Sequence, residues 1–221
     1  MGNPYLVVGS SGSGKSTSIE LLDPNATGVF EVASKRLPFR SQLPVINHAD
    51  YNMIYKVFGK AAETKKWKKI YVVDDSQYLM AFEAFNRAKE TGYQKFTDLA
   101  VNFYNLIKYV IEYLPDDVNV YFLHHTEQTE TGQIKAKTLG KMIDNQLTLE
   151  GLFTVVLYAQ TDGKRYWFTT QSDGYTTAKS PKGMFPPEID NDLAYVDRTI
   201  REYYNMTPIE GENNKEQEKT A

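Results

Sequence analysis

The chain has 221 residues, 41% of them hydrophobic, which is enough apolar material for one substantial core. Its formal net charge of −3 gives no general attraction to nucleic acid or acidic membranes, and the absence of cysteine excludes disulfides, thiolate metal sites and cysteine nucleophiles. No apolar run is long enough to span a bilayer and no secretory pattern opens the chain, so we expect a soluble cytoplasmic protein without a membrane partner.

The first strand and the loop after it carry the clearest motif. The run YLVV at 5–8 predicts a buried strand, and GSSGSGKST follows it. Gly9, Gly14, Lys15 and Ser16 fit G-x-x-x-x-G-K-[ST], the phosphate-binding loop (P-loop). KSTSIELL then predicts a helix whose positive N-terminal end faces the same anion. A linker could match by chance, but it would not lie between a strand and a helix.

Each residue type in this loop serves the binding of a nucleotide. Glycines let successive backbone N–H groups turn inward around phosphates. Lys15 would reach the β- and γ-phosphates, and the Ser16 hydroxyl would ligate Mg²⁺. The expected nucleotide-binding residues form one run: Gly9, Ser10, Ser11, Gly12, Ser13, Gly14, Lys15, Ser16 and Thr17.

Two strands and a helix follow, each next to a basic segment. TGVFEVA (27–33) and LPVINHA (43–49) predict strands, and residues 50–66 predict a helix capped by Asp50. The loop SKRLPFR (34–40) would lie at the ligand edge, near DNA or a neighbouring subunit. KKWKK (65–69) could stack on nucleic acid, but its place at a helix end favours a structural or solvated role.

The next strand supplies acidic residues. Ile70 to Val73 predict a buried strand that ends in Asp74 and Asp75. Asp74 is expected to hold the Mg²⁺ shell, and Asp75 to polarise the attacking water. The alternative is that Asp75 or Ser76 only caps the helix predicted over 76–90.

A pair of histidines ends the following strand. A helix over 96–114 stops at Pro115, and Val118 to His124 predict a strand whose end shares the ligand edge. We expect His124 to be a core residue and His125 to sense the γ-phosphate.

The remainder is antiparallel and then polar. Residues 126–143 predict a hairpin or mobile loop carrying Lys135, Lys137 and Lys141. LTLEGLFTVVLYAQ (147–160) and KRYWFTTQS (164–172) predict strands joined at an Asp-Gly turn, and 191–204 predict a helix. Residues 207–221 predict a disordered tail, which leaves 1–206 as one domain.

This order predicts an α/β fold, a RecA-like P-loop NTPase of the additional-strand branch. Its mostly parallel sheet is flanked by helices and ends in an antiparallel hairpin. The strand ending at His124 is expected between the P-loop strand and the Asp74 strand.

Four segments, VVGSSGSGKST, YVVDDSQYLM, FLHHTE and KAKTLGKMIDNQLTLEGLFTVVL, resemble the ATP-binding proteins of tailed phages, a RecA-like family of AAA-type ATPases. The resemblance runs from about residue 4 to 204. It implies an ATPase using ATP and Mg²⁺, with Lys15, Ser16 and Asp74 as Walker residues and Asp75 and His125 in catalysis. It also implies a role in DNA recombination or replication. RecA itself places its catalytic glutamate soon after the P-loop, so the base is left open.

The lysines of the predicted hairpin at 126–143 are compatible with more than one binding partner. Lys137, with Lys135 or Lys141, could enter a neighbour's ATP site as a finger residue, which requires a homo-oligomer, or could hold single-stranded DNA. Each lysine could equally be solvated. The other functional classes are an ATP-dependent regulator acting through protein contacts and a small-molecule kinase. Kinases of this kind usually have an arginine-rich lid over the phosphates, and no arginine falls within 126–141.

Overall fold

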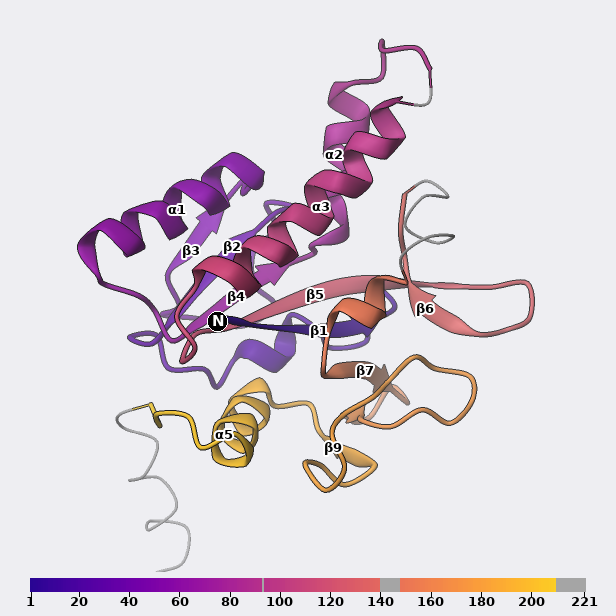
Figure 1. The fold of residues 1–221 in the computed structure, drawn as a ribbon. Coiled ribbons are helices and arrows are strands. Elements are labelled where there is room, and N and C mark those ends of the chain that lie inside the picture. Colours follow the sequence, from indigo (N-terminus) through magenta and orange to yellow (C-terminus); the bar gives the residue numbers. More distant parts are fainter. Residues whose placement is uncertain (93, 140–147, 210–221) are drawn as a thin grey trace, which may run out of the picture.

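The computed structural model of this chain describes residues 1–92, 94–139 and 148–209, and within these it forms an α/β fold (Figure 1). Its helices are α1 (Tyr51–Thr64), α2 (Gln77–Asn86), α3 (Gln94–Tyr113) and α5 (Leu193–Tyr203), with short 3-10 helices η1 (Thr17–Ile19) and η2 (Leu149–Leu152). Its strands are β1 (Asn3–Gly9), β2 (Thr27–Glu31), β3 (Val45–Asn47), β4 (Ile70–Asp74), β5 (Asn119–Gln128), β6 (Ile134–Ala136), β7 (Val156–Thr161), β8 (Tyr166–Thr169) and β9 (Glu188–Asp190).

The strands join in one mostly parallel sheet in the order β3-β2-β4-β5-β1-β7-β8-β9, with β6 paired to β5. The predicted position of β5, between β1 and β4, is confirmed. The register sets Gly9 beside His125 and Glu31 beside Asp74. Because parallel strands end at the same edge, four polar chain segments meet there.

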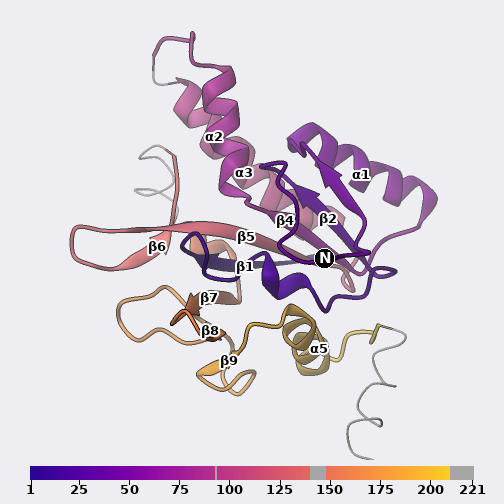
Figure 2. The same cartoon turned by 180° about the vertical axis from the view of Figure 1, so that it is seen from behind.

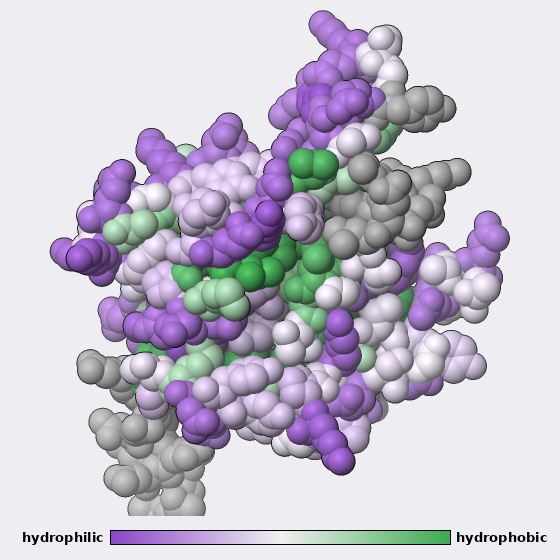
Figure 3. All heavy atoms as spheres, in the orientation of Figure 1, coloured by the Kyte–Doolittle hydropathy of each residue, from purple (hydrophilic) through white to green (hydrophobic). Residues whose placement is uncertain are grey.

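Helices cover both faces of the sheet because the strand residues alternate. Along β1, Leu6 and Val8 join the core under α1, α2 and α3, whereas Tyr5 and Val7 join the core under η1 and α5. Figures 1 and 2 show α1 and α3 on one side and α5 on the other, with the α2–α3 pair projecting from the body. In Figure 3 the largest group of hydrophobic residues lies in the middle of this face, and mostly hydrophilic residues surround it.

Several predicted boundaries are confirmed. The Asp50 carboxylate caps α1 by accepting a hydrogen bond from the Met53 backbone N–H at 2.7 Å. α3 ends at Tyr113, two residues before Pro115, which cannot continue a helix. The hairpins β5–β6 and β7–β8 are antiparallel, as the turn residues indicate.

One alternative and two expectations are wrong in detail. Neither Asp75 nor Ser76 caps α2 with its side chain, because both are engaged elsewhere. The strand expected over 147–160 begins only at Val156, after the 3-10 turn η2, and residue 147 lies outside the described residues. The polar tail begins later than 207: Ile209 is 5% exposed and packs in the core under α5, and residues 210–221 lie outside the described residues.

The KKWKK segment has a structural role. Lys65 takes a left-handed conformation (φ 53°) that ends α1. The Trp67 ring is half-buried and lies 6.2 Å from the Phe58 ring, within the core. No helix within residues 1–92, 94–139 and 148–209 is both long and apolar enough to cross a membrane.

A buried ion pair ties α5 to the lower edge of the sheet, opposite the Gly9 end. Arg201 Nε donates to Asp197 at 2.5 Å, and both side chains are at most 2% exposed. The other Asp197 oxygen accepts from Asn119 Nδ2 at 2.6 Å and from Tyr121 Oη at 2.7 Å. Arg201 also donates to the Lys69 carbonyl at 3.0 Å, so the pair links α5 to β5 and to the residue just before β4.

Removing one partner is expected to destabilise the fold strongly. Arg201→Ala leaves Asp197 charged and buried, and we expect it to lower the free energy of unfolding by about 3–5 kcal/mol. Urea denaturation followed by circular dichroism measures this. Glu202→Ala, an exposed position on the same helix, should change stability by less than about 0.5 kcal/mol. Equal losses in the two variants would contradict this role.

Candidate functional site

The Gly9–Thr17 loop wraps around the ammonium group of Lys15. Lys15 Nζ donates to the backbone carbonyls of Gly9 at 2.7 Å and Ser10 at 2.9 Å. Gly14 has φ +91°, and a Cβ there would come within 2.7 Å of the Tyr166 ring, so the position requires glycine. Burial lowers the pKa of Lys15 to about 8, against the opposing effect of Asp75 and Asp74.

The helix expected after this loop is reduced to one turn. Only Thr17–Ile19 form a 3-10 helix, and Pro24 follows too closely for an α-helix to develop. The Asp23 carboxylate accepts from the Asn25 N–H at 2.9 Å and turns the chain toward β2. The expectation that a helix N-terminus points at the loop is therefore wrong, and an anion there would have only backbone N–H groups and Lys15 as partners.

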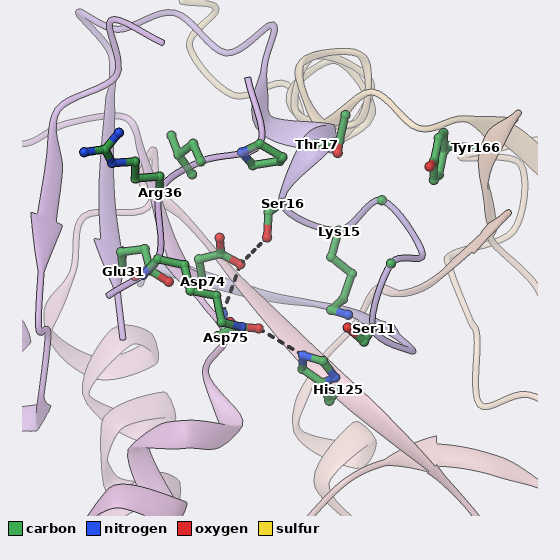
Figure 4. Close-up of a pocket in the computed structure, with 15 residues that line it drawn as sticks. Ser11, Lys15, Ser16, Thr17, Glu31, Arg36, Asp74, Asp75, His125 and Tyr166 are labelled. Atoms are coloured by element: carbon green, nitrogen blue, oxygen red, sulfur yellow. Dashed lines mark hydrogen bonds and ion pairs between the residues drawn. The ribbon is translucent and has the colours of Figure 1, made fainter. Parts of the chain in front are cut away.

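The acidic end of β4 faces this loop (Figure 4). Ser16 Oγ donates to Asp74 Oδ1 at 3.0 Å, and the Asp75 N–H donates to the same oxygen at 3.0 Å. Burial and the nearby Asp75 charge raise the pKa of Asp74 to about 6. Adjacent hydroxyl and carboxylate oxygens are hard ligands, which fits the Mg²⁺ expected at Ser16 and Asp74.

Asp75 has two side-chain partners, His125 and Lys35. Its carboxylate lies 3.0 Å from His125 Nε2 and 2.7 Å from Lys35 Nζ. Burial alone would raise the pKa of Asp75, but hydrogen bonds from His125 and Lys35 outweigh it and lower this pKa to about 2. A carboxylate so firmly ionised is a weak proton acceptor at neutral pH.

Glu31 is the site residue that the sequence reasoning missed. It ends β2 beside Asp74 in the sheet, is 2% exposed as a residue and lines the same cavity. Burial raises its pKa to about 7, although the Lys35 backbone N–H donates to its carboxylate. A carboxyl group with a pKa near neutrality is suited to general-base catalysis. An acidic residue interrupting the apolar run GVFEVA was the available signal.

The two histidines separate as expected. His124 is fully buried, and burial lowers its pKa to about 4, so it is neutral at pH 7. Its Nε2 lies 2.7 Å from the Lys137 carbonyl; a carbonyl only accepts, so this nitrogen carries the proton. Its Nδ1 lies 2.8 Å from Ser76 Oγ. His125 instead reaches the cavity through its contact with Asp75.

The site residues surround one open cavity of about 350 Å³. Figure 4 shows Glu31, Asp74 and Asp75 on one side of it and Lys15 and Ser16 on the other. The cavity lining also includes part of the basic loop, namely Lys35, Arg36, Leu37 and Pro38. Of the predicted phosphate-binding run, Ser11, Gly12, Gly14, Lys15, Ser16 and Thr17 line the cavity, whereas Gly9, Ser10 and Ser13 are not among its lining residues.

The lysines of the β5–β6 hairpin lie beside this cavity, not in it. Lys135 pairs with Glu127 at 3.0 Å. Lys137 is exposed, and its backbone N–H donates to the His125 carbonyl at 2.8 Å. Neither residue lines the cavity, and Lys141 lies outside the described residues.

Two further residues border the loop from the C-terminal strands. The Tyr166 ring of β8 and the Asn191 amide after β9 both lie against Gly14. Both amide atoms of Asn191 are buried without a hydrogen-bond partner among the described residues. A buried, unpaired amide is costly, which is typical of a group that awaits a ligand or water.

No protein-family model matches this chain, and no curated protein matches it. The function is therefore inferred from the geometry of the cavity.

Removing the Asp74 charge is expected to stabilise the protein while it lacks ligand. Folding raises the pKa of Asp74, so ionisation of Asp74 destabilises the folded state. This loss of stability is absent below about pH 4 and complete above about pH 6. Asp74→Asn keeps Oδ1, which accepts both local hydrogen bonds. Without Mg²⁺ or nucleotide at pH 8, we expect the variant to have a higher Tm and a free energy of unfolding raised by up to about 3 kcal/mol. At pH 4 both quantities should change little. A Tm that falls equally at both pH values would contradict this.

Proposed function

We propose that the protein is a Mg²⁺-dependent ATP hydrolase of the RecA-like P-loop type, as its resemblance to the ATP-binding proteins of tailed phages implies. One observation carries the proposal: Lys15, Ser16 and Asp74 meet in a single cavity, with Ser16 hydrogen-bonded to Asp74. A phosphate-binding lysine, a hydroxyl and a strand-terminal carboxylate are the parts that phosphoryl transfer requires.

The residues divide the work of hydrolysis. Backbone N–H groups of the Gly9–Thr17 loop and Lys15 bind the phosphates. Ser16 and Asp74 would hold Mg²⁺, directly or through water, and the ion would supply positive charge to the bound phosphates. Water forms a new P–O bond to the γ-phosphorus while the bond to the bridging oxygen breaks. ADP leaves, and its developing negative charge faces Lys15.

Glu31 is proposed to accept the proton of the attacking water. Its carboxyl group is buried in the cavity with a pKa of about 7, whereas the pKa of Asp75 is about 2. Asp75 then serves to hold His125, the sensor of the γ-phosphate, through their 3.0 Å contact. This revises the expectation that Asp75 is the base.

Adenine is proposed as the base of the nucleotide, held by Tyr166 and Asn191. The Tyr166 ring is 45% exposed and offers a stacking face next to the loop. An asparagine amide donates and accepts in the pattern that complements adenine N7 and N6, which guanine lacks. This pairing requires the covered amide of Asn191 to open toward the nucleotide.

Single-stranded DNA and further copies of the chain are proposed partners. Arg36 and Arg40 of the basic loop are exposed at the cavity edge of the sheet, and Lys137 is exposed on the adjacent hairpin. Such cations bind DNA phosphates or a neighbouring subunit. ATP hydrolysis with and without single-stranded DNA, with light scattering at low salt, separates this role from that of a regulator that ignores DNA.

Lys15→Ala is expected to abolish ATP turnover while leaving the fold intact, because it removes the cation that holds the β- and γ-phosphates. Purified wild type and variant are compared by phosphate release and circular dichroism. Lys56→Ala, an exposed lysine on α1, is the matched control and should retain wild-type turnover. Unchanged turnover in Lys15→Ala would overturn the proposed function.

Glu31→Gln is expected to lower kcat about 100-fold or more, because glutamine cannot accept the proton. In the wild type, kcat/KM should rise through about pH 7 as Glu31 ionises, and fall above about pH 8 as Lys15 loses its proton. Glu20→Gln, an exposed position, is the control. A full rate in Glu31→Gln, with the rising limb intact, would return the role of base to another residue.

A further inference from the structure

Lys35 places a second ammonium group at the cavity that holds Lys15. Its Nζ lies 2.7 Å from Asp75 Oδ2 and 5.4 Å from the centre of the Tyr78 ring. The side chain is 60% exposed and lines the same cavity as Lys15, Ser16 and Asp74. Lys35 is therefore paired with Asp75, which Figure 4 shows across the cavity from Lys15.

The backbone that carries Lys35 is fixed in an unusual conformation. Ser34 has φ +59° and His48, after β3, has φ +56°, both left-handed and costly for side chains other than glycine. Ser34 Oγ lies 2.6 Å from His48 Nδ1 and accepts from the His48 N–H at 3.0 Å. The Lys35 N–H is bound by the Glu31 carboxylate. Strain held by several bonds is characteristic of functional positions.

The ion pair with Asp75 alone does not explain this arrangement. A salt bridge with one partner this exposed contributes little to stability. Lys35 and Lys15 line the same cavity, so their two positive charges repel each other. A polyanion between them would remove that repulsion and be bound by both.

We propose that Lys35 contacts the γ-phosphate from within the same chain and stabilises the charge of the transition state, an inference that rests on the proposed ATPase function. On binding, the Lys35 ammonium exchanges Asp75 for a γ-phosphate oxygen, and Asp75 keeps its contact with His125. Lys35 then supplies the charge for which Lys137 of a neighbouring copy was one candidate. Each chain carries a complete hydrolytic site.

The alternative cation, Lys137, has a different environment. Its side chain is exposed and does not line the cavity, and its backbone is used to hold His124 and His125. The finger role expected for Lys137 would place it in the ATP site of another copy of the chain. The two assignments therefore differ in whether turnover requires contact between copies.

The test measures turnover and ligand affinity in Lys35→Ala, Lys35→Arg and the control Lys56→Ala. We expect kcat for MgATP to fall about 100-fold or more in Lys35→Ala, to recover in part in Lys35→Arg, and to stay at the wild-type value in Lys56→Ala. Affinity for MgADP, which lacks the γ-phosphate, should change by less than about threefold, whereas affinity for MgADP with aluminium fluoride should fall as kcat does. A merely structural lysine would weaken both ligands equally.

Mixing variants decides between one chain and two. Lys35→Ala and Lys15→Ala proteins are combined, so that a neighbour could supply the missing lysine. We expect the mixture to show no more than the sum of the separate activities; a rise above the sum would overturn the single-chain assignment. Full kcat in Lys35→Ala would overturn Lys35 while leaving the ATPase intact. Absence of turnover and of nucleotide binding in the wild type would instead remove the ATPase proposal, and Lys35 with it.

Discussion

The parallel register of β2, β4, β5 and β1 is the constraint on which the site depends. It places Glu31 beside Asp74 and Gly9 beside His125, with Asp75 directly after the end of β4. Side chains alternate between faces along a strand, so a shift of one residue would exchange the two cores and disperse these groups. The register is held by apolar side chains buried on both faces, such as Val72 and Val73 of β4. Packing of the sheet thus fixes the chemistry at its edge.

Buried carboxylates have different surroundings at the lower edge of the sheet and at the upper edge, where Gly9, Glu31 and Asp74 lie. At the lower edge, Asp197 accepts hydrogen bonds from Arg201, Asn119 and Tyr121, so its charge is compensated within the protein. At the upper edge, Asp74 and Glu31 are buried with fewer partners, and their pKa values rise to about 6 and about 7. The lower edge contributes specificity to the fold. At the upper edge, the buried carboxylates of Asp74 and Glu31 destabilise the fold until a ligand compensates their charge.

Sequence reasoning found what depends on local patterns and missed what depends on pairing between distant segments. The position of β5 between β1 and β4 follows from the match to the additional-strand branch of P-loop NTPases. The helix ends at Asp50 and Pro115 and the β7–β8 hairpin follow from caps and turns. Lys15, Ser16 and Asp74 follow from motif spacing, and they line one cavity. The importance of Glu31 depends on β2 pairing with β4, which no local pattern specifies. Lys35 was visible only as one of several cations in a basic loop. The tail boundary was misplaced for the same reason. Ile209 is a single apolar residue without a repeating hydrophobic pattern, and its burial depends on packing against distant segments.

The charges at the cavity indicate what kind of ligand would complete it. Three carboxyl groups, those of Glu31, Asp74 and Asp75, line it together with the cations Lys15, Lys35 and Arg36. An anion alone would bind the cations but repel the carboxylates, and a divalent cation alone would do the reverse. A magnesium-bound nucleoside triphosphate brings both charges, so its phosphates would bind the cations and its metal ion would bind the carboxylates. The raised pKa values of Asp74 and Glu31 and the lowered pKa of Lys15 express the same incompleteness, since each group is partly desolvated before its counter-charge arrives.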